Sequence, residues 1–260
     1  MTFSDEELTR YARQIVLPEL GGMGQARLAR AGVAVVGAGG IGSPAIQYLA
    51  AAGIGRLVLI DDDRVEISNL QRQTIFAAAD AGRLKVEAAA DAVARLNPHV
   101  MVDARSVRLD AANAAALLAG VDAILDGSDS FATRLAVSDA SLALEVPLVS
   151  ASVAQFEGQL AVYRGWRAML PCYRCLVGTP ADDPDRSCAA AGVLGPVAGV
   201  MGSLAAVEAV RAIVPFGADP AGSLLIVDAG SFRFRTIALR KDPACPSCRD
   251  GGNQPDTQVH

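Results

Sequence analysis

The sequence predicts an α/β protein with a doubly wound, mostly parallel sheet that antiparallel C-terminal strands extend, and with a structural zinc site made of four cysteines. Apolar runs alternate with helical spacing in the first half, which favours a parallel sheet. The last apolar run of the second half alternates with period 2, which favours antiparallel pairing. Two Cys-x-x-Cys pairs predict the metal site. We expect a single domain over residues 1–248 and a disordered tail over 249–260.

Short apolar runs bounded by glycine, proline or polar residues predict the strands of the first half. They cover residues 33–37, 56–61, 122–127 and 147–152. Helical spacing predicts helices over residues 43–53, 79–96 and 131–143. Strands that alternate with helices in this way form the crossover units of a parallel sheet.

The second half differs from the first. Strands are predicted over 159–164, 223–230 and 232–239, and a helix begins at Pro196 and extends to about Ile213. A polar, proline-rich stretch over 178–190 carries Cys188, and we expect it to be a mobile crossover loop.

Composition limits the classes of function. The 260 residues are 52% hydrophobic and carry a net charge of −5, which argues against nucleic acid or an anionic membrane as a partner. The N-terminal sequence MTFSDEELTR is acidic and polar, so we expect no signal peptide and a cytoplasmic protein. Residues 189–207 carry no charge, but their glycine and alanine content favours a closely packed core helix over a membrane span.

Four of the five cysteines form two pairs, Cys172 with Cys175 and Cys245 with Cys248. Two such pairs match the four-thiolate pattern of structural zinc, although the separation between them is longer than in a zinc ribbon. Cys188 is left over, either as a spectator thiol or as a nucleophile.

A glycine-rich turn, Gly37-x-Gly39-x-x-Gly42, lies directly after a predicted strand and before a predicted helix. Glycines in this position let the backbone approach phosphates at the helix N-terminus, as in Rossmann-like sheets. Asp61 ends the next strand, where a carboxylate accepts hydrogen bonds from ribose hydroxyls. The pattern predicts a nucleotide site but does not separate NAD from ATP.

The segment that follows favours a triphosphate. Arg72 lies in the stretch SNLQRQ, and Lys85, one of only two lysines, comes thirteen residues later. A diphosphate cofactor needs no such cations, whereas charge that builds up during displacement at phosphorus does. The alternative for Lys85 is a residue on the solvated face of a helix.

Two aspartates follow another predicted strand in LDGSDSFATR. Because ligands bind at the carboxyl ends of strands in open α/β sheets, Asp126 and Asp129 should border the same crevice. Asp129 is a candidate ligand of Mg²⁺ bound to phosphates. The alternative for Asp129 is to cap the helix predicted from Phe131.

These motifs together resemble the ThiF/MoeB/HesA family. The resemblance extends from about Leu8 to Cys248 and rests on stretches in the family's order: RYARQ, VGAGGIGSP, LIDDDRVEISNLQRQ, LKVEAA, LDGSDSFATR, PCYRCL, SCAAAGVLGPVAGVMGSLAAVEAVR and CPSC. It implies an adenylyltransferase that activates the C-terminal glycine carboxylate of a small ubiquitin-like sulfur-carrier protein ending in Gly-Gly. ATP, Mg²⁺ and Zn²⁺ are the expected cofactors.

The resemblance also assigns roles to residues. Arg13 would reach the phosphates from the second protomer of a homodimer, and Asp129 would hold Mg²⁺. The residues expected to be catalytic are Arg13, Arg72, Lys85, Asp129 and Cys188. Those expected to bind the nucleotide are Gly37, Gly39, Gly40, Gly42, Asp61, Asp63, Ser68, Asn69, Leu70, Gln71, Arg72, Gln73, Lys85, Asp129 and Ser130. Ser130 stands where the family usually has Asn.

Two branches of the family compete. The residues after Cys188 lack the acidic residue of the molybdopterin branch, and the three aspartates at 61–63 also favour the thiamine branch with a ThiS-like carrier. There the matching cysteine can form an acyl disulfide with the carrier's thiocarboxylate, and a cysteine desulfurase is a candidate sulfur donor. A MoaD-like carrier is the alternative, and a NAD-dependent oxidoreductase or a silent scaffold is favoured less. Since a carboxylate nucleophile needs no general base, the presence of only two histidines is no obstacle.

Overall fold

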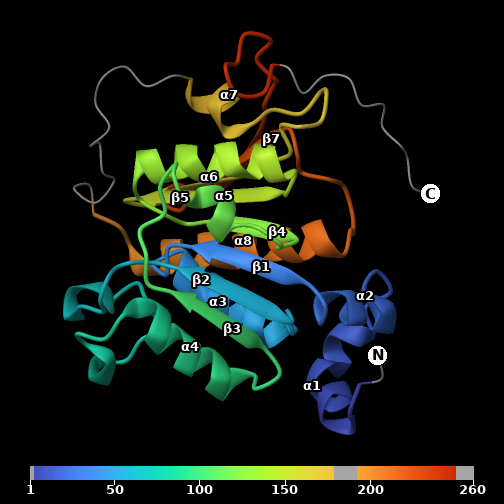
Figure 1. Ribbon diagram of the computed structural model, residues 1–260, viewed down its shortest axis with the longest axis vertical. Helices are drawn as coiled ribbons and strands as arrows, with labels where there is room; N and C mark the ends of the chain where they lie inside the picture. Colours follow the sequence, from blue (N-terminus) through green and yellow to red (C-terminus); the bar gives the residue numbers. More distant parts are fainter. Residues whose placement is uncertain (1–2, 179–191, 250–260) are drawn as a thin grey trace.

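Eight strands form one mixed sheet in the computed structural model, which describes residues 3–178 and 192–249 (Figure 1). Their order across the sheet is β3-β2-β1-β4-β5-β6-β7-β8. The strands are β1 (Gly32–Val36), β2 (Arg56–Ile60), β3 (Met101–Arg105), β4 (Ala123–Asp126), β5 (Leu148–Ala154), β6 (Glu157–Tyr163), β7 (Ser223–Asp228) and β8 (Arg233–Ala238). The five strands from β3 to β5 pair in parallel, and those from β5 to β8 pair antiparallel. The predicted fold class is confirmed.

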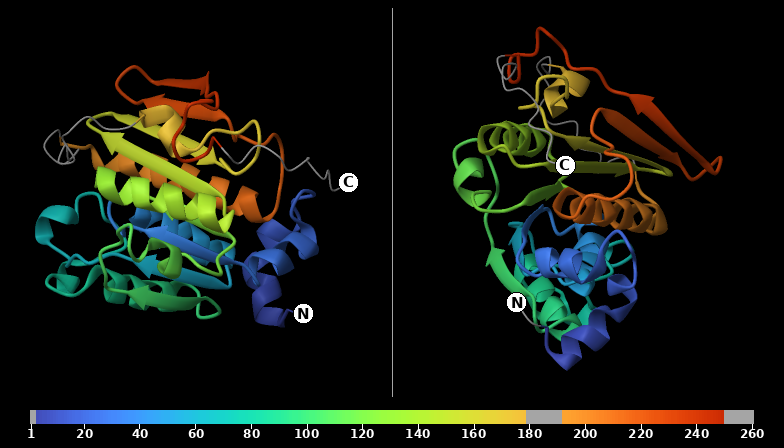
Figure 2. Two further views of the ribbon diagram at one scale, coloured as in Figure 1. Left: turned by 45° about the horizontal axis from the view of Figure 1, so that its top comes forward. Right: turned by 90° about the vertical axis from the view of Figure 1, so that its right-hand side faces the viewer.

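Helices cover both faces of the parallel part of the sheet (Figure 2). They are α1 (Asp5–Ile15), α2 (Gly21–Leu28), α3 (Gly42–Ala52), α4 (Lys85–Leu96), α5 (Ala114–Leu117), α6 (Phe131–Leu144), α7 (Tyr173–Val177) and α8 (Gly195–Ile213). Alternate residues of each buried strand face opposite sides, so that Val33 and Val35 pack with α3, α4 and α8, whereas Ala34 and Val36 pack with α5 and α6. The two resulting core layers hold the strand ends in fixed positions.

The small residues of helix α8 allow it to pack closely against its neighbours. It is 19 residues long with a mean hydropathy of 1.4, which is enough by length and composition to cross a membrane. In the structure it packs against α3, β5 and β6. A Cβ atom on Gly202 would lie 2.3 Å from the carbonyl oxygen of Ile41, and one on Gly195 would lie 2.2 Å from that of Gln71. Its small residues therefore let α8 approach the backbone of the segments around α3.

Helix α4 begins later than predicted. The spacing predicts a helix from residue 79, but Ala78–Asp80 forms one 3₁₀ turn and the helix starts at Lys85. Gly82 has a φ of +86°, and Leu84 forms an isolated bridge with Arg64. This turn anchors the chain beside the end of β2 and determines where Lys85 emerges.

Several elements were not predicted. Strand β3 is only partly buried, and α5 and α7 are very short, so none has a strong apolar pattern. Helix α1 docks through Tyr11, whose hydroxyl accepts a hydrogen bond of 2.9 Å from the side chain of the buried Asn97. The tail over 250–260 and most of the predicted crossover loop lie outside the described residues.

The packing of α8 predicts opposite effects at two of its glycines. We expect Gly202→Ala to lower the free energy of unfolding by about 1–3 kcal/mol, because the new methyl group overlaps the Ile41 carbonyl. Gly199 is the matched control, since a Cβ there meets no atom within 4 Å. Gly199→Ala should raise the free energy by up to about 1 kcal/mol through helix propensity. Urea denaturation of both variants checks this, and equal effects would contradict the packing argument.

Candidate functional site

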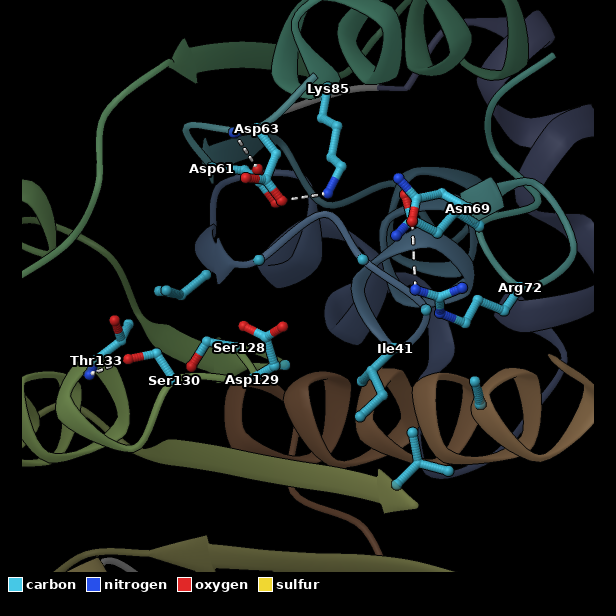
Figure 3. Close-up of a pocket in the computed structure, with 18 of the residues that line it drawn as sticks. Ile41, Asp61, Asp63, Asn69, Arg72, Lys85, Ser128, Asp129, Ser130 and Thr133 are labelled. Carbon is cyan, nitrogen blue, oxygen red and sulfur yellow. Dashed lines mark hydrogen bonds and ion pairs between the residues drawn. The ribbon is translucent and has the colours of Figure 1, made fainter. Parts of the chain in front are cut away.

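A cavity of about 460 Å³ opens at the carboxyl ends of β1, β2, β4 and β5. It lies where the strand order reverses, because β1 pairs with β2 on one side and with β4 on the other. Such a switch point is the usual ligand site of an open α/β sheet. Figure 3 shows side chains from the β2–α4 region on one side of this cavity and from the β4–α6 loop on the other.

The floor of the cavity is the glycine-rich turn between β1 and α3. Gly37 has a φ of +85°, and a Cβ there would come within 3.2 Å of the Gly127 backbone. A Cβ on Gly42 would lie 1.9 Å from the Gly37 carbonyl oxygen, so Gly42 serves close helix–strand packing and does not line the cavity. Gly39 and Gly40 do line it, beside the N-terminal end of α3, where backbone N–H groups favour anions.

Asp61 ties the glycine-rich turn to the end of β2. Its carboxylate accepts hydrogen bonds from the backbone N–H of Ala38 at 2.7 Å and of Asp63 at 2.8 Å. Burial raises the pKa of Asp61, and the nearby charge of Lys85 acts in the opposite direction. A carboxylate has about four lone-pair positions, so further acceptor capacity remains for a ligand hydroxyl.

Lys85 extends into the cavity from the first turn of α4. Its side chain is only 5% exposed, and its Nζ lies 2.6 Å from Oδ2 of Asp63 (Figure 3). The alternative of a solvated helix residue is therefore wrong. Asp63 itself is largely exposed. The ion pair with it orients the ammonium group of Lys85 at the edge of the glycine-rich floor.

Arg72 is held beside the same floor. Its guanidinium donates to the Ser68 carbonyl and to Oδ1 of Asn69, both at 3.3 Å. The neighbouring Gln73 is buried, and its Oε1 accepts no hydrogen bond from any described residue. A buried polar atom without a partner at a cavity wall is suited to a ligand donor.

The β4–α6 loop forms the facing wall. Ser130, not Asp129, caps α6, since its hydroxyl accepts the backbone N–H of Thr133 at 3.4 Å. The capping alternative for Asp129 is therefore wrong. The Asp129 carboxylate accepts no hydrogen bond from the described residues and lies across the cavity from Lys85 (Figure 3). An oxygen ligand in this position fits a divalent cation on bound phosphates.

Most of the residues predicted to bind a nucleotide line this one cavity. Those that do are Gly37, Gly39, Gly40, Asp61, Asp63, Asn69, Gln71, Arg72, Gln73, Lys85, Asp129 and Ser130. Gly42, Ser68 and Leu70 do not, and Arg13 is exposed on α1 outside the lining. Cys188 lies outside the described residues.

Other residues line the cavity that were not predicted as site residues. They are mainly neutral or apolar side chains, such as Ile41, Thr133, Ser152, Val153 and Ala198, together with Arg108 and Arg134. Of these residues, only Arg134 could have been found from the sequence as a residue near the site, because it stands one turn into the predicted helix after Asp129. Arg108 follows β3, the strand that was not predicted.

Four cysteines meet at the far end of the sheet. The sulfur atoms are separated by 3.8 Å between Cys172 and Cys175, 3.6 Å between Cys172 and Cys245, and 3.5 Å between Cys175 and Cys248. Tetrahedral zinc with four thiolates implies sulfur separations of about 3.8 Å. The predicted four-cysteine cluster is confirmed.

The four thiols differ in their surroundings, and the segments that carry them are fastened to α6. Burial raises the pKa of Cys172 and raises that of Cys248 to about 12. Burial opposes ionisation of Cys245 as well, but backbone N–H groups of Ser247 and Cys248 outweigh it and lower the pKa. Arg174 pairs with Asp139 at 2.7 Å, and Asp139 also accepts from Ser247. These bonds tie the two Cys-x-x-Cys segments to α6.

The fold and the site together define a nucleotide-binding protein of the doubly wound α/β class. The family model of the ThiF family matches residues 11–247, and the chain belongs to this family. It is 45% identical, over 98% of its own length and 95% of the relative's, to a sulfur carrier protein adenylyltransferase of Thermus thermophilus. It is 42% identical to a molybdopterin-synthase adenylyltransferase of Escherichia coli, over 94% and 98% of the two lengths.

A solved structure shares the fold. The chain superposes on Escherichia coli MccB, crystallised with ATP, with a TM-score of 0.80 over 93% of this chain and 75% of that one. The sequence identity in this comparison is 23%, so the similarity concerns the fold alone.

The site geometry predicts a charge-specific effect of Lys85. We expect Lys85→Ala to weaken ATP binding about 10- to 100-fold, because a hydrogen bond between charged groups is worth about 1.5–3 kcal/mol. Arg64→Ala is the control, since Arg64 is exposed and does not line the cavity, and among the described residues its guanidinium donates to the Gly82 carbonyl. Calorimetric titration with ATP measures the affinity of both variants. If Lys85→Ala binds ATP as tightly as Arg64→Ala does, Lys85 does not contact the nucleotide.

Proposed function

We propose that the protein adenylates the C-terminal glycine carboxylate of a small ubiquitin-like sulfur-carrier protein. ATP and the carrier would give the carrier acyl-adenylate and pyrophosphate. The observation that carries this proposal is the arrangement of Lys85, Arg72 and Asp129 around a glycine-rich floor in a chain of the ThiF family. Relatives at more than 40% identity are named as adenylyltransferases of such carriers, which supports it.

The chemistry requires positioning and charge neutralisation. The carboxylate forms a bond to the α-phosphorus while the bond from that phosphorus to the β-phosphate oxygen breaks. Because the nucleophile is ionised at neutral pH, no proton has to be removed. Lys85 and Arg72 would stabilise negative charge on the phosphates, and Asp61 would hold the ribose. Arg13, exposed on α1, would be supplied by the partner subunit of a homodimer.

Asp129 is the residue that would hold magnesium. Its carboxylate has no donor among the described residues and lies across from the cationic side of the cavity, so it fits a cation shared with phosphate oxygens. When bound, Mg²⁺ would neutralise charge on the triphosphate. Ser130 would contribute less than the family's usual Asn, since its hydroxyl already caps α6.

The pathway is a narrower proposal. The residues after Cys188 and the three aspartates at 61–63 favour a ThiS-like carrier of thiamine biosynthesis. The relatives named molybdopterin-synthase adenylyltransferase favour a MoaD-like carrier. A cysteine desulfurase as sulfur donor, a covalent role of Cys188 and a cytoplasmic location also stay proposals. Intact-mass spectra of both carriers after incubation with ATP and the protein would separate the branches.

The adenylation proposal predicts ATP–pyrophosphate exchange that depends on a Gly-Gly-ended carrier. We expect Asp129→Ala and Arg72→Ala to reduce exchange on the order of 100-fold or more, because each removes a charge that faces the phosphates. Asp91→Ala, an exposed acid on α4 outside the cavity, should leave exchange unchanged. Absence of exchange with every such carrier would refute the proposed function.

The four-cysteine cluster predicts one zinc ion per chain. Cys245→Ser should abolish zinc retention and lower the melting temperature, since one thiolate of a closed tetrahedral set is lost. Cys188→Ala should retain the metal and the exchange activity, because adenylation needs no thiol. Elemental analysis and thermal unfolding measure these effects. Much less than one zinc per chain in the purified protein would overturn the assignment.

A further inference from the structure

Arg134 is a buried cation that the adenylation step described above does not use. It lies near the start of α6 with 9% of its surface exposed. Its guanidinium donates to Oγ of Ser150 at 3.2 Å, to the carbonyl of Ala151 at 2.7 Å and to the carbonyl of Ser128. All three acceptors are neutral, and two of the five N–H groups have no acceptor among the residues that the structure describes.

The positive charge of Arg134 has no ionic partner in the described part of the chain. The acidic side chains there form their ion pairs with other residues or with none. Burying an unpaired charge costs several kcal/mol even where neutral groups bond to it. Arg134 is therefore suited to bind an anion that would supply the missing negative charge.

The position of Arg134 indicates which anion this would be. A second cavity of about 140 Å³ adjoins the first, and Asp129, Arg134 and Ser152 line both. Beyond these shared residues its walls are largely apolar, formed by Phe131, Tyr163, Tyr173, Leu176 and Leu224. Arg134 thus lies at the junction between the nucleotide cavity and a smaller, largely apolar cavity, whose walls suit an uncharged peptide end.

A cation at this junction would assist the proposed reaction. The carrier brings one more negative charge towards a triphosphate, and at close range the two anions repel each other strongly in a partly desolvated site. Lys85 and Arg72 face the floor of the nucleotide cavity, where the phosphates would lie. A separate cation beside the entering carboxylate would offset the repulsion and hold the oxygen near the α-phosphorus.

We propose that Arg134 binds the C-terminal carboxylate of the carrier at the junction of the two cavities, before that carboxylate attacks ATP. This rests on the proposed function and adds the residue that holds the nucleophile. A merely structural role is the competing explanation, because Arg134 also connects the β4–α6 loop to β5 through the carbonyls of Ser128 and Ala151.

The test compares two forms of the carrier. One ends in the natural carboxylate and the other in the C-terminal amide, and their binding to the protein is measured calorimetrically without ATP. We expect the wild-type protein to prefer the carboxylate about tenfold or more, as a charge-assisted pair implies. R134Q should bind both forms equally, and R134K should keep the preference because it keeps the charge.

Controls separate charge from folding. R134Q should keep the circular dichroism spectrum and the melting temperature of the wild type, which reports an intact fold. R211Q is the matched control, because Arg211 also donates to backbone carbonyls but lies at the end of α8, outside both cavities. It should retain the full preference for the carboxylate. If R134Q fails to fold, R134K decides, since loss of the preference in a folded, ATP-binding R134K contradicts the proposal.

Each remaining outcome has one meaning. If R134Q discriminates between carboxylate and amide as the wild type does, Arg134 is structural and the inference is wrong. Equal binding of both forms by the wild type also overturns it. If no Gly-Gly-ended carrier binds or supports pyrophosphate exchange, the proposed function itself fails, and the inference fails with it.

Discussion

Close backbone approach around the glycine-rich turn is the constraint on which the rest of the site depends. Gly37 meets the Gly127 backbone, Gly42 meets the Gly37 carbonyl, and Gly202 of α8 meets the Ile41 carbonyl. A side chain at any of these positions would separate elements that must touch. Because β1, β4, α3 and α8 converge without intervening side chains, the cavity floor is presented by backbone whose position the core fixes. The charged side chains of the site surround this floor, whose position the core packing fixes.

The distribution of charge follows from this arrangement. Lys85 and Arg72 come from α4 and the segment before it, and the β4–α6 loop presents Asp129 opposite them, with Arg134 following in α6. Asp61 lies at the glycine-rich turn, where it accepts the backbone N–H of Ala38, and its burial there raises its pKa. Under the proposed adenylation, a site organised this way would act on a substrate that is already charged. It would need neither a nucleophilic side chain nor a general base.

The strands other than β3, the glycine-rich turn and the four cysteines could be predicted because each has a strong local pattern. Buried strands such as β1 are continuous apolar runs, and paired thiols have a fixed spacing. The start of α4 was predicted wrongly because alanine-rich residues before Lys85 fit a helix, whereas backbone hydrogen bonds with residues 63–65, which follow β2, override that propensity. The burial of Lys85 and the cap at Ser130 depend on tertiary contacts, which no spacing along the chain encodes. Arg134 was missed as a site residue, although it stands one turn into the predicted helix after Asp129. Its burial and its lack of an ionic partner among the described residues depend on tertiary contacts.

Helix α7 links two features that seem separate. With five residues it is too short to be stable alone, and Cys172 and Cys175 anchor it to the C-terminal segment. The same turn contributes Tyr173 and Leu176 to the wall of the second cavity. An ion in the thiolate cluster and a peptide in the second cavity would therefore contact neighbouring residues of one helical turn. Their binding equilibria are thermodynamically linked to the extent that both require α7 in this position, and the linkage is reciprocal.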